Sequence, residues 1–70
     1  MQKRSNKKRK LLYSIIDSSS EETIINVLGI DGLFSGATEY EAVARAMVWI
    51  AEEENLEERN VSITKKPAPT

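Results

Sequence analysis

The chain has 70 residues, enough for one small domain of a size that is marginally stable alone. It contains no Cys and no His, which excludes disulfides and most zinc sites. No stretch approaches the roughly 18 apolar residues of a membrane span, and the basic N-terminus lacks a signal-peptide core. We therefore expect a cytoplasmic or nucleoid-associated protein, in the host cytoplasm if viral, that is stabilised by a partner subunit.

Charge is distributed unevenly along the chain, although the net charge is only -1. Residues 1–10 sum to +6, residues 11–58 carry Arg45 against all eleven acidic residues and sum to -10, and residues 59–70 sum to +3. A basic arm ahead of an acidic body is typical of a nucleic-acid-binding tail, and equally of a solubilising terminus. We expect residues 1–8 to form a disordered basic arm.

Residues 10–16 form a short apolar run whose period fits either a strand or a helix face. Its β-branched and aromatic content, and the Asp-Ser-Ser-Ser sequence that follows, favour a strand. In one register Leu11, Tyr13 and Ile15 face the core, and in the other they face outward. We adopt the first register, because it buries the aromatic ring and leaves Lys10 outside.

A first helix is expected to begin at residues 18–22. Ser18 and Ser19 are each followed by a Glu three residues later, which is the pattern of a capping box at a helix start. The apolar residues of this helix are Ile24, Ile25, Val27 and Leu28. Glycines at positions 29 and 32 weaken it, and residues 35–36 are predicted to form a turn.

The clearest helix in the sequence runs from about residue 39 to about residue 54. Thr38 can act as its N-cap, with Glu41 completing a capping box. One face carries apolar residues at helical spacing, namely Val43, Ala46, Met47 and Ile50. A second face is apolar too, with Ala44, Val48 and Ala51. A helix that is apolar nearly all round must be buried, so we expect a second chain to cover it.

Residues 55–70 are expected to form a C-terminal tail. Within it, residues 61–64 alternate Val-Ser-Ile-Thr, which predicts either a short edge strand or an extended segment. The Pro-containing end, residues 65–70, is typical of disordered chain. The predicted organisation is thus an arm (1–8), a folded domain (9–54) and a tail (55–70).

Strand, helix, Gly-containing turn and capped helix is the element order of the ribbon-helix-helix DNA-binding family, of the Arc, MetJ and CopG type. Residues 36–43, Gly-Ala-Thr-Glu-Tyr-Glu-Ala-Val, resemble the family's turn and second-helix start. Residues 46–52 resemble the second helix of antitoxins of the RelB and DinJ kind. The likeness covers residues 10–54 and implies a mainly α fold with one short N-terminal strand, in which two chains form an intertwined homodimer.

In that family the paired strands enter the DNA major groove, and the second helix holds a phosphate at its N-terminus. Carried onto this chain, the resemblance implies base contacts by Lys10, Leu12 and Ser14. The implied phosphate contacts are Lys7, Lys8, Arg9, Ala37 and Thr38. The implied dimer core is Leu11, Tyr13, Ile15, Val43, Met47 and Ile50.

The resemblance predicts a homodimeric repressor that binds specific DNA sequences, autoregulatory and of phage, plasmid or antitoxin type. The main alternative is a small protein-interaction module that binds a toxin or another protein through its acidic helix end and tail, residues 52–70. A third possibility is an all-α DNA binder with residues 7–17 as its first helix. Without His, Cys or a P-loop pattern, we expect no catalysis, no metal and no cofactor.

Overall fold

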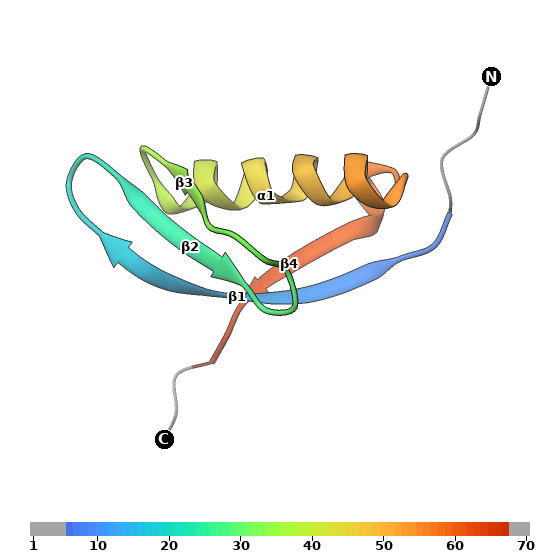
Figure 1. Ribbon diagram of the computed structural model, residues 1–70, viewed down its shortest axis with the longest axis horizontal. Helices are drawn as coiled ribbons and strands as arrows, with labels where there is room; N and C mark the ends of the chain where they lie inside the picture. The colour runs from blue at the N-terminus through green and yellow to red at the C-terminus, as the bar shows by residue number, and fades with distance from the viewer. Residues whose placement is uncertain (1–5, 68–70) are drawn as a thin grey trace.

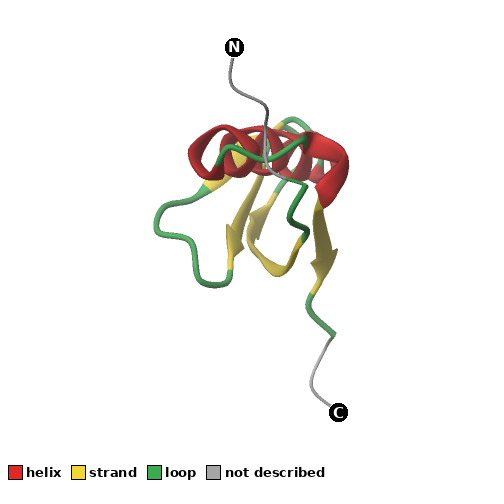
Figure 2. Ribbon diagram, turned by 90° about the vertical axis from the view of Figure 1, so that its right-hand side faces the viewer, coloured by secondary structure: helices red, strands yellow, loops and turns green. Residues whose placement is uncertain are grey.

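The computed structural model describes residues 6–67. Two layers make up the fold, a four-stranded sheet and one helix that lies across one face of it (Figure 1, Figure 2). In chain order the elements are β1 (Arg9–Ser18), β2 (Thr23–Val27), β3 (Phe34–Gly36), α1 (Glu39–Glu54), the 3-10 helix η1 (Glu58–Asn60) and β4 (Val61–Lys65). Residues 1–5 of the predicted arm and residues 68–70 of the predicted tail lie outside the described part.

This architecture corrects the expected fold class. The strand order is β3-β2-β1-β4, with β1 antiparallel to β2 and parallel to β4. Because β1 has a neighbour on each side within its own chain, it has no free edge with which to form a ribbon with a second copy. The mainly α, intertwined ribbon-helix-helix fold is therefore wrong for this chain, as is an all-α fold, and the observed fold is α+β.

The predicted N-terminal strand is confirmed as β1, and it is longer than expected. Leu11 and Tyr13 are only 9% and 7% exposed, and Ile15 packs against the same core. The side chains at these alternate positions point to one face of the sheet, as the pleat requires. The register adopted from the sequence is thus the one observed, up to an irregularity in the pairing between Ile15 and Asp17.

The predicted first helix is instead a turn followed by β2. The hydroxyl of Ser19 accepts hydrogen bonds from the backbone N–H groups of Glu21 and Glu22, at 3.3 and 3.1 Å. The backbone N–H of Ser19 in turn donates to the carbonyl of Glu22 at 2.8 Å. These are the bonds that a serine makes at a helix start, but here they close the β1–β2 hairpin. The β-branched residues after the turn then continue as a strand.

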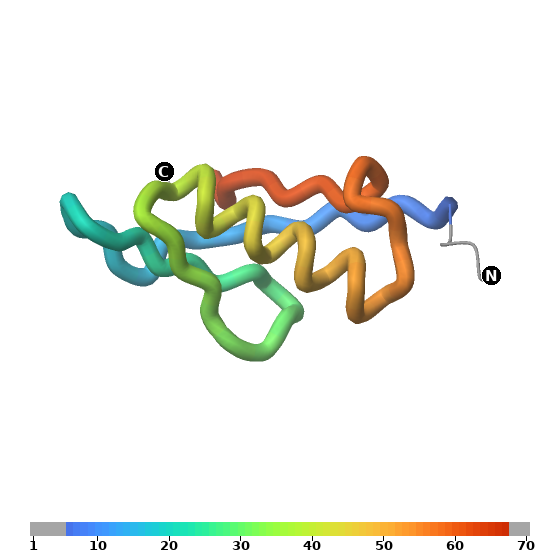
Figure 3. Tube along the Cα trace, turned by 90° about the horizontal axis from the view of Figure 1, so that it is seen from above, coloured from blue at the N-terminus to red at the C-terminus, as the bar shows by residue number. Residues whose placement is uncertain are grey.

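β3 ends at Gly36, where the first turn of α1 lies directly against the strand. A Cβ atom at this glycine would lie 2.7 Å from both the backbone N of Ala42 and the Cβ of Glu41. Only a residue without a side chain permits so close an approach. The chain reaches β3 from β2 through residues 28–33, a loop that extends beside the helix in Figure 3.

Both ends of α1 are capped by local hydrogen bonds. Thr38 is the predicted N-cap, and its hydroxyl accepts the backbone N–H of Glu41 at 3.2 Å. At the other end Asn55 adopts a left-handed conformation (φ 55°), and the N–H of Leu56 donates to the carbonyl of Ala51 at 2.8 Å. This Schellman arrangement turns the chain back toward the sheet, so that Leu56 is buried at 2% exposure.

The sheet is completed by β4, which runs parallel to β1 from the Arg9–Val61 pair to the Tyr13–Lys65 pair. Residues 61–64 therefore form the edge strand that was one of the two predicted options. α1 connects β3 with β4 at opposite edges of the sheet, so it crosses the face diagonally (Figure 3). Buried between the layers are Leu11, Tyr13, Ile25, Val27, Ala42, Ala46, Ile50, Ala51, Leu56 and Val61.

Within residues 6–67, no helix combines the length and the apolar character that a bilayer crossing demands.

Candidate functional site

The side of α1 that faces away from the sheet carries large apolar side chains. The core side of the helix is filled by Ala42, Ala46 and Ile50, which are fully buried. Elsewhere around the helix Tyr40 is 83% exposed, Val48 46% and Trp49 43%, with Tyr40 and Trp49 on different flanks of α1. We call this surface the outer α1 face. Its exposed members are Tyr40, Val48 and Trp49, and it is bordered by Ala44 and by Val43 and Met47, which also pack partly against the core.

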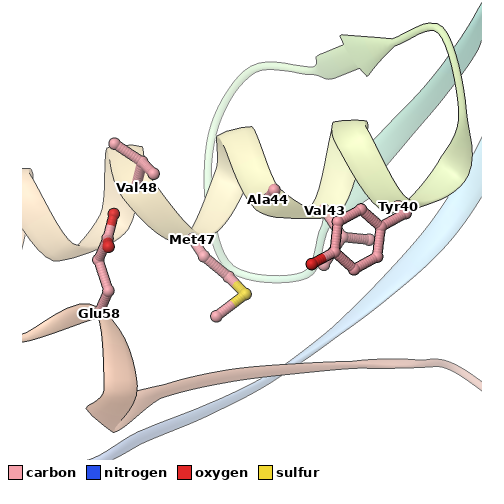
Figure 4. Close-up of a pocket in the computed structure, with 6 residues that line it drawn as sticks. All are labelled: Tyr40, Val43, Ala44, Met47, Val48 and Glu58. Atoms are coloured by element: carbon pink, nitrogen blue, oxygen red, sulfur yellow. The ribbon is translucent and has the colours of Figure 1, made fainter.

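Two shallow hollows flank Val48 on the outer α1 face. The first has a volume of about 200 Å³ and is lined by Tyr40, Val43, Ala44, Met47, Val48 and Glu58 (Figure 4). Figure 4 shows the side chain of Glu58 rising from η1 at the end of the hollow that lies away from Tyr40. Since Glu58 is the only charged residue among these six, the hollow is suited to an apolar group with a polar or basic neighbour.

The second hollow lies on the other side of Val48, with a volume of about 480 Å³, and is lined by Ala44, Arg45, Val48, Trp49 and Glu52. The ring of Trp49 meets the ring of Phe34 edge to face, with centroids 5.7 Å apart and planes at 63°. This contact with β3 fixes one side of the indole. The remaining side is exposed, so the hollow has a rigid aromatic wall.

Opposite charges border the second hollow. Arg45 and Glu52 are seven residues apart, which is about two helical turns, so they lie on the same side of α1. Among the described residues Arg45 forms no ion pair, whereas Arg9 pairs with Glu54 at 2.8 Å. The outer α1 face therefore presents a guanidinium group that is not already engaged by a carboxylate of residues 6–67.

The residues expected to contact bases lie together on the sheet face that α1 leaves uncovered. Lys10, Leu12 and Ser14 alternate along β1 with the buried residues, so they point away from the helix. Ser62 and Thr64 of β4 are the register partners of Lys10 and Leu12, and they place two hydroxyl groups beside them. The structure thus brings the three predicted residues into one row.

That row nevertheless lies in the middle of a wide sheet. Neighbouring strands are about 4.8 Å apart, so four strands span roughly 14 Å, whereas the DNA major groove is about 12 Å wide. A two-stranded ribbon enters such a groove, but β1 is flanked by β2 and β4. A nucleic acid on this face would therefore lie across the sheet and contact it through its backbone.

The residues expected to hold phosphate are dispersed. The N–H of Ala37 donates to the carboxylate of Glu41 at 2.9 Å, and the hydroxyl of Thr38 is engaged with the same residue's N–H. The protein's own carboxylate thus occupies the place at the helix N-terminus where a phosphate was expected. Arg9 pairs with Glu54, while Lys7 and Lys8 are exposed ahead of β1.

The residues expected to form a dimer core instead pack within one chain. Leu11, Tyr13 and Ile50 are buried in the single-chain core, and Val43 and Met47 pack partly against it, as does Ile15. The sequence pattern did identify the second apolar face through Ala44 and Val48. It did not identify Tyr40 and Trp49 as surface residues. Tyr40 lies one helical turn before Ala44, and Trp49 directly follows Val48, so their positions in the sequence carried this signal.

In residues 6–67 no three Asp or Glu side chains gather in a way that could hold a metal ion. No family model, curated protein or solved structure matches this chain.

Proposed function

We propose that this chain is a small cytoplasmic protein-interaction module, rather than an enzyme, which docks a partner protein on the outer α1 face. The observation that carries the proposal is the exposure of Tyr40, Val48 and Trp49 on a helix whose opposite side already fills the core. Contiguous exposed apolar groups mark interaction sites, and aromatic residues dominate the energy of protein interfaces. Tyr40 and Val48 are not part of the buried core, so packing within the single chain does not account for their apolar side chains.

The charges around this face support the same proposal. Glu58 lines the first hollow and Glu52 the second. Both belong to the acidic helix end and tail through which the alternative prediction has the chain bind a partner. Arg45 adds the opposite charge within the same surface. Charged groups at the rim of an apolar patch select and orient the partner more than they strengthen binding. That the partner is a toxin bound through residues 52–70 stays a prediction.

The experiment selects peptides from a random helical library on the immobilised protein and asks which face they bind. Independent binders should converge on the outer α1 face, because it offers the rigid apolar hollows that peptides need. Val48→Asp should weaken most selected peptides at least about tenfold, since it places a charge between the hollows. The matched control, Leu12→Asp on the uncovered sheet face, should leave them unaffected. Selected peptides that bind the Val48→Asp variant as tightly as the wild type would contradict the proposal.

A second candidate function, nucleic-acid binding, is favoured by the lysines of the uncovered sheet face. Lys10 is exposed there, and Lys66 extends β4 by one residue, its N–H donating to the carbonyl of Tyr13 at 2.8 Å. The acidic side chains of α1 lie in the other layer. Lysines beside the hydroxyl groups of Ser62 and Thr64 suit contacts with a phosphate backbone.

This second candidate is tested by measuring the affinity for duplex DNA over a range of salt concentrations. Changing Lys10 and Ser14 together to Ala should weaken binding and reduce the slope of log K against log salt by about one. Val48→Asp serves as the control, because it lies in the other layer. Unchanged DNA affinity and slope in the double variant would refute binding at this face.

A further inference from the structure

We infer that the partner docked on the outer α1 face is a second copy of this chain, with the two α1 helices antiparallel. This inference rests on the proposed function and names its partner. It starts from the spacing of Arg45 and Glu52, which lie on the same side of α1 with Val48 and Trp49 between them. The face is therefore complementary to itself when one copy is reversed.

The two-fold axis that relates such copies passes between residues 48 and 49. Arg45 and Glu52 are equally far from that axis along the helix, about 5 Å each at 1.5 Å per residue. Reversing the second copy therefore sets each Arg45 opposite Glu52 of the other copy. Two ion pairs form at once, as the symmetry of an isologous dimer requires.

The apolar groups fit the same arrangement. Near the axis, Val48 of one copy lies against Trp49 of the other, where the second hollow has room for it. Ala44 lines both hollows and has a small side chain, which allows the helices to approach closely. Both copies bury their exposed valine and indole in a single contact, so the apolar side chains nearest the axis cover one another.

A parallel, in-register pairing of the two helices is disfavoured by charge. A parallel pair in register sets Arg45 against Arg45 and Glu52 against Glu52, and like charges in contact repel. The antiparallel pair also leaves the uncovered sheet face of each copy pointing outward, because α1 covers the opposite face of the sheet (Figure 2). The dimer thus has four layers, with the helices in the middle.

The experiment is sedimentation equilibrium over a wide concentration range with charge-reversal variants. The wild-type chain should show a monomer–dimer equilibrium. Arg45→Glu and Glu52→Arg, each alone, should weaken self-association about tenfold or more, because both ion pairs become repulsive. An equimolar mixture of these two variants should restore dimers, since a heterodimer regains two attractive pairs. Both positions are exposed, and circular dichroism verifies that each variant is folded.

The controls separate this inference from the proposed function. Val48→Asp should be monomeric, whereas Leu12→Asp should associate like the wild type. A wild-type chain that stays monomeric, while selected peptides still lose affinity for Val48→Asp, overturns the second copy as partner and leaves the docking face standing. If the wild type dimerises but the mixture of Arg45→Glu and Glu52→Arg does not, the antiparallel pairing is overturned.

Discussion

The phenol of Tyr13 on β1 donates a hydrogen bond to the carboxylate of Glu39 in the first turn of α1. This bond joins the central strand to the start of the helix across the core. Because the hydrogen bond and the burial both favour the neutral phenol, as does the negative charge of Glu39, they raise the pKa of Tyr13 to about 12.

Because of the raised pKa, the stability of the fold should decrease at alkaline pH. In the unfolded chain the phenol loses its proton near pH 10, whereas in the folded protein it keeps the proton until about pH 12. The contribution of Tyr13 to the free energy of unfolding should therefore be fully present below about pH 10 and should be lost between pH 10 and 12. Urea unfolding at several pH values measures this decrease.

The control for that measurement is Tyr13→Phe, which should lose this alkaline component of the pH dependence. Tyrosinate absorbance in a Tyr40→Phe background follows Tyr13 alone, because the chain has two tyrosines. A transition of the folded protein near pH 10 in that background would contradict the link to Glu39.

Gly36→Ala should destabilise the fold by about 2–3 kcal/mol, as overpacking at a rigid contact does. The new methyl group would meet the backbone of Ala42 and the Cβ of Glu41, both at 2.7 Å, and neither is the end of a flexible side chain. Urea unfolding measures the change. Ser35→Ala, one residue earlier in β3, is the matched control and should change stability by less than about 1 kcal/mol. Equal stability of the two variants would show that α1 can move away from β3.

At the C-terminal end of α1, two substitutions of Asn55 should act in opposite directions. Its φ of 55° lies in the left-handed region, which glycine adopts without strain and alanine does not. Asn55→Gly should leave thermal stability unchanged or slightly raised, while Asn55→Ala should lower the free energy of unfolding by about 1 kcal/mol. Thermal unfolding followed by circular dichroism provides the comparison. An alanine variant as stable as the glycine variant would mean that the cap is not left-handed.

Ser19→Ala should destabilise the β1–β2 hairpin by about 1 kcal/mol, the typical loss when a serine cap is removed. The variant leaves the N–H groups of Glu21 and Glu22 without the hydroxyl that accepts them. Hydrogen exchange of these two amides should accelerate more than exchange in α1. Ser20→Ala is the control, and equal effects of the two variants would argue against the bonds of Ser19.

The same serine shows where prediction from sequence was limited. A Ser followed by Glu three residues later has the same short-range hydrogen bonds at a helix start and in a tight turn. The spacing therefore could not decide between the predicted helix and the observed hairpin. The β-branched residues Thr23, Ile24, Ile25 and Val27 carried the opposing signal, and the sheet that surrounds them decides the outcome.

Features set by local sequence were predicted better. The N-cap at Thr38 and the extent of α1 follow from side-chain spacing. The inward register of Leu11 and Tyr13 was chosen because it buries the aromatic ring and leaves Lys10 outside, and the structure confirms it. The pairing of β1 with β4 depends on residues far apart in the chain, and no local pattern records it. For the same reason the sequence indicated that α1 has more apolar residues than one face needs, but it did not indicate which of them lie on the outer α1 face.

The parallel pairing of β1 with β4 also determines when this protein can fold during synthesis. It joins residue 9 to residue 61, so the ribosome makes the central strand early and its neighbour last. Until residue 65 has emerged, the nascent chain lacks β4, and one edge of β1 remains open to other chains. Folding is therefore completed only after β4 has been translated. Chaperones that shield exposed strand edges can act between the emergence of β1 and that of β4.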